Sequence, residues 1–227
     1  MTVAVRPESA EVPASYAGYV GKIRDGEDLM AVLAGQLDEV RSAFGRFPEA
    51  RGSYRYAPGK WSVKELLGHL SDTERIFCYR ALRFARGDAT PLPGFDENAY
   101  APEMRADERP LAELLEEWLD VRRATISCLR GLPADTWTRR GVASGKEISV
   151  RALAYAIAGH TRHHLEVLAE RLAILLPGTP VLFTSGYTDG EIVRRGLLAP
   201  ESDFLAKPFS PDAVVRAVRE RLAPAKV

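Results

Sequence analysis

Four stretches of the sequence between residues 28 and 172 place apolar residues three and four positions apart, the period of an α-helix with one buried face. The second stretch has the best-marked start, because Ser62 and Glu65 have the spacing of a capping box. Amphipathic helices bury their apolar faces against one another. The sequence therefore predicts a mainly α-helical protein built on a four-helix bundle. The expected helices cover about residues 28–47, 62–86, 110–129 and 150–172.

Two segments outside these helices have no sustained period. Residues 1–26 are rich in Pro, Ala, Gly and Ser, and we expect an N-terminal tail or strap. Residues 90–100 (TPLPGFDENAY) lie in the connection between the second and third helices. This connection is long for a bundle, and long ordered loops tend to line binding sites. A simple crossover strap is the alternative interpretation.

The pattern changes after residues 176–178 (LPG). Residues 180–186 form a short apolar run bounded by Pro and Gly, which is typical of a buried parallel strand. A helix-like stretch, a second short run at 203–206 and an amphipathic segment at 211–222 follow. We therefore expect a small C-terminal β-α-β-α appendage.

Composition narrows the classes of function. The chain has 31 basic and 31 acidic residues, so no net field favours nucleic acid or an anionic membrane. No apolar run approaches the roughly 20 residues that span a bilayer, and no leader pattern opens the sequence, so we expect a cytoplasmic protein. Cys78 and Cys128 form no CxxC pair and fall in helical patterns, which favours two reduced, packed thiols.

Three of the four histidines fall on predicted apolar helix faces. His160 and His164 are one turn apart on the fourth helix, and His69 lies at the edge of the apolar stripe of the second. An unsatisfied buried imidazole costs about 1–3 kcal/mol, and a divalent metal ion accepts such nitrogens. Three imidazoles leave a coordination position open, as in reactive metal sites. Core histidines bonded to carbonyl groups are the alternative, and His163 is expected to flank the site or face solvent.

Four further residues near the histidines are candidates for supporting roles. Asp72 and Glu74 flank His69 and could orient an imidazole or move a proton, so they are the candidate catalytic residues; solvated carboxylates are the alternative. Gly68 and Gly159 precede His69 and His160, and we expect them to let helices approach closely at the metal layer. Two neutral small residues would be the simpler explanation.

Three motifs in order resemble the DinB-like superfamily over residues 28–172. They are KWSVKELLGHL at 60–70, PGFDENAY at 93–100 and AGHTRHHLEVL at 158–168. The resemblance implies an up-up-down-down four-helix bundle that holds a divalent metal ion through His69, His160 and His164. Characterised members of that superfamily include thiol S-transferases, a mycothiol-dependent isomerase and metal-dependent hydrolases.

The C-terminal segment resembles the second half of a response-regulator receiver domain, which has a flavodoxin-like fold. The resemblance implies that Ser185 is the hydroxyl switch residue, Phe204 the switch aromatic and Lys207 the phosphoryl-pairing lysine. The strands that carry the acidic ligands and the phosphorylated aspartate have no counterpart, so we do not expect phosphotransfer. The expected division is a tail (1–26), a metal-binding bundle (27–172) and a partial receiver (173–227). Because two strands leave a sheet edge unpaired, we expect a homodimer.

The leading hypothesis for function is a metal-dependent hydrolase or thiol S-transferase that acts on a small molecule. Zinc is the default ion for histidine ligands, and nickel, iron or manganese would also fit three imidazoles. The sequence offers no dedicated nucleophile, so water or a low-molecular-weight thiol has to supply it. The alternative is a non-catalytic interaction or signalling module whose receiver segment promotes dimerisation or docks a partner.

Overall fold

The computed structural model describes residues 5–175, 183–185, 204–206 and 210–222. The chain divides into two compact units, residues 1–167 and 168–227. Among the described residues, no helix combines the length and the hydropathy that a membrane span requires.

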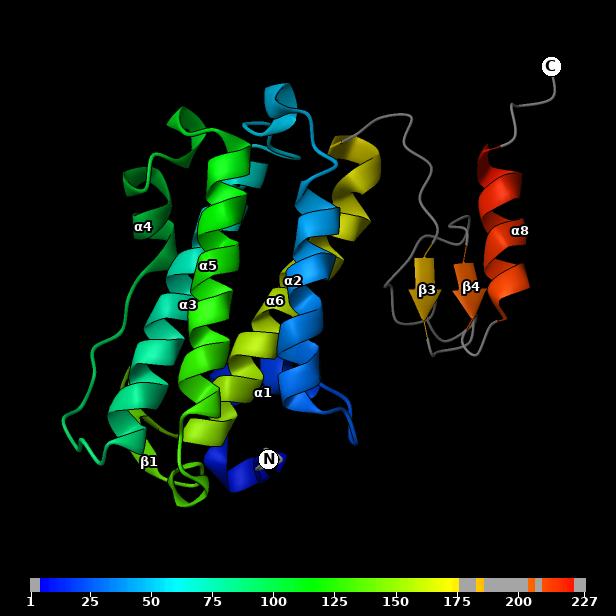
Figure 1. Cartoon of the computed structure of the whole chain (residues 1–227). Helices are drawn as coiled ribbons and strands as arrows, with labels where there is room; N and C mark the ends of the chain where they lie inside the picture. Colours follow the sequence, from blue (N-terminus) through cyan, green and yellow to red (C-terminus); the bar gives the residue numbers. More distant parts are fainter. Residues whose placement is uncertain (1–4, 176–182, 186–203, 207–209, 223–227) are drawn as a thin grey trace. The chain divides into compact units, whose positions relative to one another are not determined.

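The first unit contains the predicted bundle. Its four long helices are α2 (Leu29–Phe44), α3 (Val63–Ala85), α5 (Leu111–Arg130) and α6 (Val150–Leu175), of which the last eight residues belong to the second unit (Figure 1). The predicted capping box at the start of α3 is present, since Ser62 Oγ accepts a hydrogen bond from the Glu65 N–H at 3.0 Å and the Glu65 carboxylate accepts one from the Ser62 N–H at 2.7 Å. The remaining elements of this unit are η1 (Ser9–Glu11), α1 (Ala14–Gly21), η2 (Glu49–Arg51), α4 (Glu97–Glu103), η3 (Ala106–Glu108), η4 (Ala134–Thr136), β1 (Arg140–Ala143) and β2 (Lys146–Ser149).

The helix directions differ from those implied by the resemblance. In chain order α2, α3, α5 and α6 run up, down, down and up, not up, up, down and down (Figure 1). The starts of α3 and α5 lie together, because Glu49 pairs with Lys64 and also accepts a hydrogen bond from the Leu111 N–H at 2.9 Å. The paths of the two connections set these directions. Residues 45–62 reverse the chain at one end of the bundle, whereas residues 86–110 return along the whole helix and make α5 parallel to α3.

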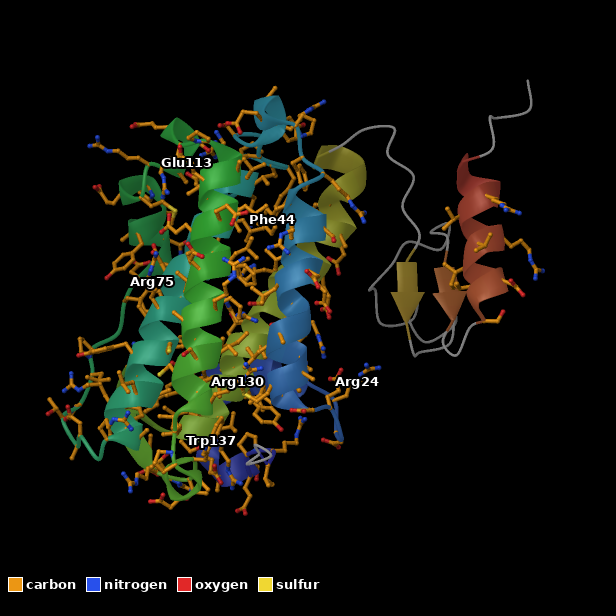
Figure 2. All side chains as sticks on the ribbon, in the orientation of Figure 1. Arg24, Phe44, Arg75, Glu113, Arg130 and Trp137 are labelled. Carbon is orange, nitrogen blue, oxygen red and sulfur yellow. The ribbon has the colours of Figure 1, made fainter. Side chains whose placement is uncertain are left out.

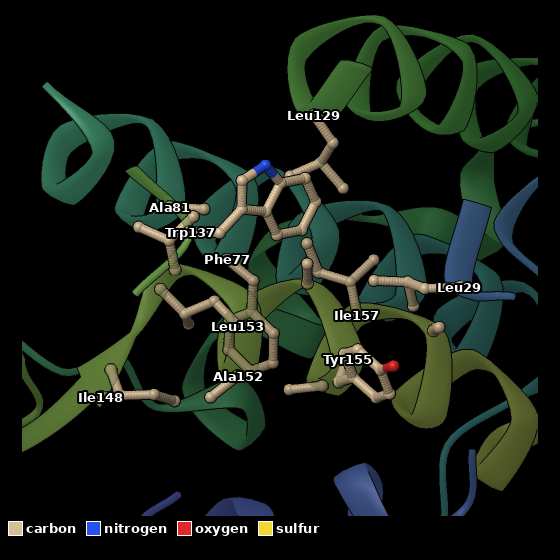
Figure 3. Packing of buried hydrophobic residues seen from close by; sticks show 14 of the residues in the cluster. Leu29, Phe77, Ala81, Leu129, Trp137, Ile148, Ala152, Leu153, Tyr155 and Ile157 are labelled. Atoms are coloured by element: carbon tan, nitrogen blue, oxygen red, sulfur yellow. The ribbon is translucent and has the colours of Figure 1, made fainter. Parts of the chain in front are cut away.

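Helix α6 is the centre of the core. Ala152, Leu153, Ala154, Ala156 and Ala158 are all fully buried, so its first half is covered on every side. Phe77 and Ala81 of α3 and Leu129 of α5 pack against it (Figure 3). Charged side chains such as Arg75 and Glu113 point outward from the bundle (Figure 2).

The N-terminal segment is a strap and not a free tail. Tyr16 and Val20 of α1 are buried in the core cluster. The buried Glu11 carboxylate accepts hydrogen bonds from Ser149 Oγ and Arg151 Nε, each at 2.7 Å, at the start of α6. The sequence did not reveal this packing, because a helix of only eight residues is too short to show a clear period.

A β-hairpin that the sequence analysis did not predict precedes α6. Strands β1 and β2 pair antiparallel and are joined by Ser144 and Gly145, both with positive φ (52° and 71°). Each strand has only four residues, which is too short to show in the sequence the alternation of apolar and polar residues that marks a strand. The backbone N–H of Leu92 donates to the Val142 carbonyl at 2.9 Å, so the hairpin also holds the crossover between α3 and α5.

After the end of α6, the described residues of the second unit form two short strands and a helix. Strands β3 (Phe183–Ser185) and β4 (Phe204–Ala206) pair in parallel, with Phe183 opposite Phe204, and α8 covers Pro211–Leu222. The helix expected between the strands and Lys207 lie outside the described residues. The likeness to a receiver domain therefore stays a prediction.

Candidate metal centre

The three predicted histidines converge in the interior of the first unit. His69 comes from the second turn of α3, and His160 and His164 come from consecutive turns of α6. Their Nε2 atoms face one another, at 3.0 Å between His69 and His160 and at 3.1 Å between His164 and His160. One ring nitrogen from each residue lies within 4.8 Å of the other two.

The donor set of this cluster fits a divalent metal ion. A single imidazole nitrogen either donates or accepts one hydrogen bond, so His160 Nε2 cannot satisfy both neighbours. A cation bound among the rings would accept all three lone pairs. Tetrahedral zinc, with bonds of about 2.0–2.1 Å to imidazole, holds its nitrogens roughly 3.3 Å apart, close to the observed spacings. Thr73 Oγ1 lies 3.4 Å from His69 Nδ1, on the other side of that ring.

Burial keeps the three rings neutral. His69 and His160 are 7% and 4% exposed, and His164 is half-buried. Burial lowers the pKa of His69 to about 4. Burial, with the neighbouring His69 and His163, lowers the pKa of His164 to about 3, and the pKa of His160 also falls well below its usual value. All three imidazoles therefore carry free lone pairs at neutral pH, as metal binding requires.

We expect the metal-free protein to lose stability between pH 6.5 and 5.5. Below pH 6.5 the unfolded chain protonates His69, whereas the folded chain, with a pKa of about 4, does not. The unfolded state then binds more protons, so acidification lowers the free energy of unfolding by about 1 kcal/mol across this interval for His69 alone. Urea unfolding of chelator-treated protein at several pH values measures how steeply the free energy of unfolding falls with pH.

A His69→Asn variant is the matched comparison, because its free energy of unfolding should depend less steeply on pH once the buried ring of His69 is gone. The acidic group Glu27 does not interfere, because hydrogen bonds from Arg162 and Arg24 outweigh burial and lower its pKa from 4.5 to about 2, so its contribution is lost only below pH 4.5. An unchanged slope in His69→Asn would contradict the assignment of the effect to the buried ring.

Aromatic side chains surround the histidine cluster. The Trp61 ring centroid lies 4.4 Å from that of His69, and the Tyr19 ring meets His160 edge-on at 5.1 Å. Trp61 lies just before Ser62, the N-cap of α3, and Tyr19 belongs to α1. Sequence reasoning assigned neither residue to the site. Trp61 lies inside the first family-like motif, which was an available signal, whereas nothing in the N-terminal segment distinguished Tyr19.

The two glycines beside the histidines make room for segments outside the four bundle helices. A Cβ atom on Gly68 would lie 2.4 Å from Met104 Sδ, just after α4, and one on Gly159 would lie 1.8 Å from the Tyr19 carbonyl oxygen. A close approach at the histidine layer was expected between bundle helices. The structure instead shows close contacts with α1 and with the α3–α5 crossover, which cover the site.

The two candidate catalytic carboxylates have different surroundings. Glu74 is buried, and both its oxygens accept hydrogen bonds from Arg122, at 2.7 and 2.8 Å. Arg122 also donates to Thr161 Oγ1 at 2.9 Å, next to His160 in the chain. Asp72 is half-buried, 3.5 Å from Arg75, and burial raises its pKa. Glu74 therefore holds a structural ion pair, and Asp72 is the carboxylate less tightly bound.

Arg122 is a residue of the site region that sequence reasoning missed. It is fully buried and donates further hydrogen bonds to Gln36 Oε1 and, at 3.3 Å, to the Leu33 carbonyl. Gln36 in turn donates to the Ala158 carbonyl at 2.7 Å. The network thus ties α2, α3, α5 and α6 together beside the histidines. In the sequence Arg122 continues the apolar stripe of Trp118, Leu119 and Ile126, whereas Arg123 does not, so the helical period was an available signal.

Fold and site together define a class, the helix bundles with an inward-facing histidine cluster. The chain belongs to the DinB superfamily, whose family model matches residues 33–168. The fold is similar to that of YfiT from Bacillus subtilis, a probable metal-dependent hydrolase with an unusual four-helix bundle topology. That similarity has a TM-score of 0.56 at 16% identity and covers 74% of this chain and 93% of YfiT. No curated protein matches the chain.

Proposed function

We propose that this protein is a metal-dependent hydrolase that acts on a small molecule, with a divalent ion held by His69, His160 and His164. The observation that carries the proposal is the convergence of three neutral imidazoles, two of them buried and one half-buried, whose Nε2 atoms lie 3.0–3.1 Å apart in two pairs. The family and the fold shared with YfiT support it. Zinc is the first candidate, and nickel, iron and manganese accept the same ligands.

A divalent ion with an open coordination position supplies Lewis acidity and makes a bound water or thiol acidic enough to react near neutral pH. The residues of this chain provide the setting. Trp61 and Tyr19 place apolar rings beside the histidines and restrict access of water. Asp72, three residues after His69 and held by one 3.5 Å contact to Arg75, is our candidate for proton transfer. Glu74 acts as a positioning residue through Arg122.

Elemental analysis of the purified full chain tests the metal site. We expect about one equivalent of metal per chain, and we expect His160→Ala and His164→Ala to weaken metal affinity by about 100-fold or more, since even partners of a ligand contribute 10–100-fold. His163→Ala is the matched control, because this half-buried ring neighbours His164 but is not one of the three converging residues. Its metal content should equal that of the wild type.

Tryptophan fluorescence is a second measurement, and it reports on metal binding at the histidines. Trp61 lies against His69, so its fluorescence should change when cobalt or nickel binds, and Trp61→Phe should lose that change. If the wild-type chain holds no stoichiometric metal, and His164→Ala changes neither metal content nor melting temperature, the proposal is wrong. That result would favour the non-catalytic interaction module.

Substrate screening separates hydrolysis from thiol transfer. The metal-loaded protein is offered a panel of small esters and amides, and separately an electrophile with a low-molecular-weight thiol. Turnover of the first panel, lost in His160→Ala, supports the hydrolase. Turnover of the second alone would replace it with a thiol S-transferase on the same metal site.

A further inference from the structure

Thr73 is a buried hydroxyl residue beside one of the three converging histidines. It follows His69 by one turn on α3, and its Oγ1 atom lies 3.4 Å from His69 Nδ1. Thr73 is 2% exposed and His69 is 7% exposed, so bulk water has little access to either group. The other ring nitrogen, Nε2, faces His160 Nε2 at 3.0 Å. Thr73 therefore contacts the nitrogen of His69 that points away from the histidine cluster.

The partner of the Thr73 hydroxyl is unusual for a residue inside a helix. A serine or threonine in a helix commonly bonds to the carbonyl oxygen four residues earlier. Ser71, on the same helix, does so, with its Oγ atom 3.4 Å from the Leu67 carbonyl oxygen. The partner that the structure gives to Thr73 is instead the imidazole of His69. The hydroxyl of Thr73 therefore acts on the ring of a candidate metal ligand.

This contact distinguishes the two possible placements of the His69 ring. Turning an imidazole over about its Cβ–Cγ bond exchanges each nitrogen with a carbon atom. In the observed placement Nδ1 meets the Thr73 hydroxyl and Nε2 points into the cluster. In the other placement a C–H group would meet the hydroxyl, and Nε2 would leave the cluster. The Trp61 ring, 4.4 Å away between centroids, packs against the imidazole but does not hydrogen-bond one edge of it.

The same contact bears on which nitrogen of His69 carries the proton. A neutral imidazole has one N–H group and one nitrogen lone pair. A lone pair on Nε2 requires the proton on Nδ1, and a buried N–H group without an acceptor costs about 1–3 kcal/mol. The Thr73 hydroxyl oxygen provides an acceptor at this nitrogen. In metal sites the hydrogen bond made by one ring nitrogen fixes the other as the ligand.

We propose that Thr73 is a positioning residue of the metal centre, which accepts a hydrogen bond from His69 Nδ1–H and thereby directs the Nε2 lone pair of His69 into the histidine cluster. The consequence for metal binding rests on the proposed function, whereas the hydrogen bond itself needs no metal. In the metal-free protein His160 Nε2–H can donate to the same lone pair across 3.0 Å. One tautomer of His69 therefore suits both states.

Nitrogen-15 NMR of the full wild-type chain, treated with a chelator at pH 7, tests the hydrogen bond. We expect the His69 ring to carry its proton on Nδ1, and we expect this buried N–H group to exchange slowly with water. The ring signals that disappear in His69→Asn identify the residue. A proton on Nε2 of His69 would overturn the proposal. Because the wild type is used, the result does not depend on a variant folding.

Two substitutions measure the consequence for metal binding. Thr73→Val keeps the shape of the side chain and removes the acceptor, so zinc affinity should fall about 10–100-fold, the usual effect of losing the partner of a metal ligand. Thr73→Ser keeps a hydroxyl and should recover most of the affinity. Ser71→Ala is the matched control, because it removes a buried hydroxyl of α3 that bonds to the Leu67 carbonyl oxygen. Its zinc affinity should equal that of the wild type.

Failure of this inference is distinguishable from failure of the metal site. If the wild type binds zinc and Thr73→Val binds it equally tightly, Thr73 does not position His69, although the metal site stands. An equal loss of affinity in Ser71→Ala would also overturn the proposal, because packing of the helix would then be the cause. If the wild type binds no zinc, the proposed function fails, and the NMR result alone decides whether Thr73 holds the tautomer of His69.

Discussion

Arg122→Leu is expected to lower the free energy of unfolding by about 3–5 kcal/mol, the cost of leaving one partner of a buried ion pair uncompensated. Glu74 is 3% exposed and Arg122 is fully buried, so water cannot replace either partner. The substitution also removes the donors to Thr161 and Gln36. Urea unfolding followed by helical circular dichroism, at pH 7 and with the metal content held constant, measures the change.

The neighbouring arginine provides a matched control. Arg123 pairs with Asp120 at 2.6 Å, but their side chains are 48% and 75% exposed. An exposed pair of this kind contributes about 0–1 kcal/mol, so Arg123→Leu should have little effect. The double variant Glu74→Leu/Arg122→Leu should recover much of the loss, because it leaves no buried charge. Equal effects of the two single arginine substitutions would refute this account of the network.

The second large loss of stability is expected for Gly159→Ala. A Cβ atom at this position would lie 1.8 Å from the Tyr19 carbonyl oxygen, which is backbone and cannot move without α1. We expect a loss of about 3 kcal/mol, at the upper end for overpacking. Residues 14–21 should also become sensitive to proteases, although no histidine is changed. Urea unfolding and limited proteolysis with mass mapping measure the two effects.

Gly35→Ala is the corresponding control on α2. A Cβ atom there meets nothing within 4 Å, and the residue lies in the interior of a helix. Alanine should therefore stabilise the protein by about 0.5–1 kcal/mol through helix propensity. If Gly159→Ala behaved like Gly35→Ala, the close contact between α1 and α6 would be absent in solution.

The parts of the fold that the sequence predicted are those with local signals. The four long helices repeat their apolar residues over many turns, and Ser62 and Glu65 mark the start of α3. The histidines could be grouped because each falls within an apolar stripe, where an imidazole needs a partner. The convergence of His69, His160 and His164 was therefore predictable from the sequence.

The parts that the sequence analysis missed depend on contacts between distant residues. Helix α1 carries Tyr19 to His160 although its eight residues show little amphipathicity. Glu74 looked like a solvated or catalytic carboxylate, because nothing near it in the chain indicates its partner Arg122. The helix directions were taken from a family resemblance.

The histidine cluster and its cover belong to different parts of the architecture. The three histidines stand on bundle helices that are held by Arg122 and the core, whereas Tyr19 and Met104 come from α1 and the crossover. Loops and short helices outside a core tolerate sequence change far better than the core does. Under the proposed function, substrate preference would diversify in these two segments while the arrangement of the three histidines is inherited unchanged. Grafting them together onto a relative's bundle should transfer selectivity as one module.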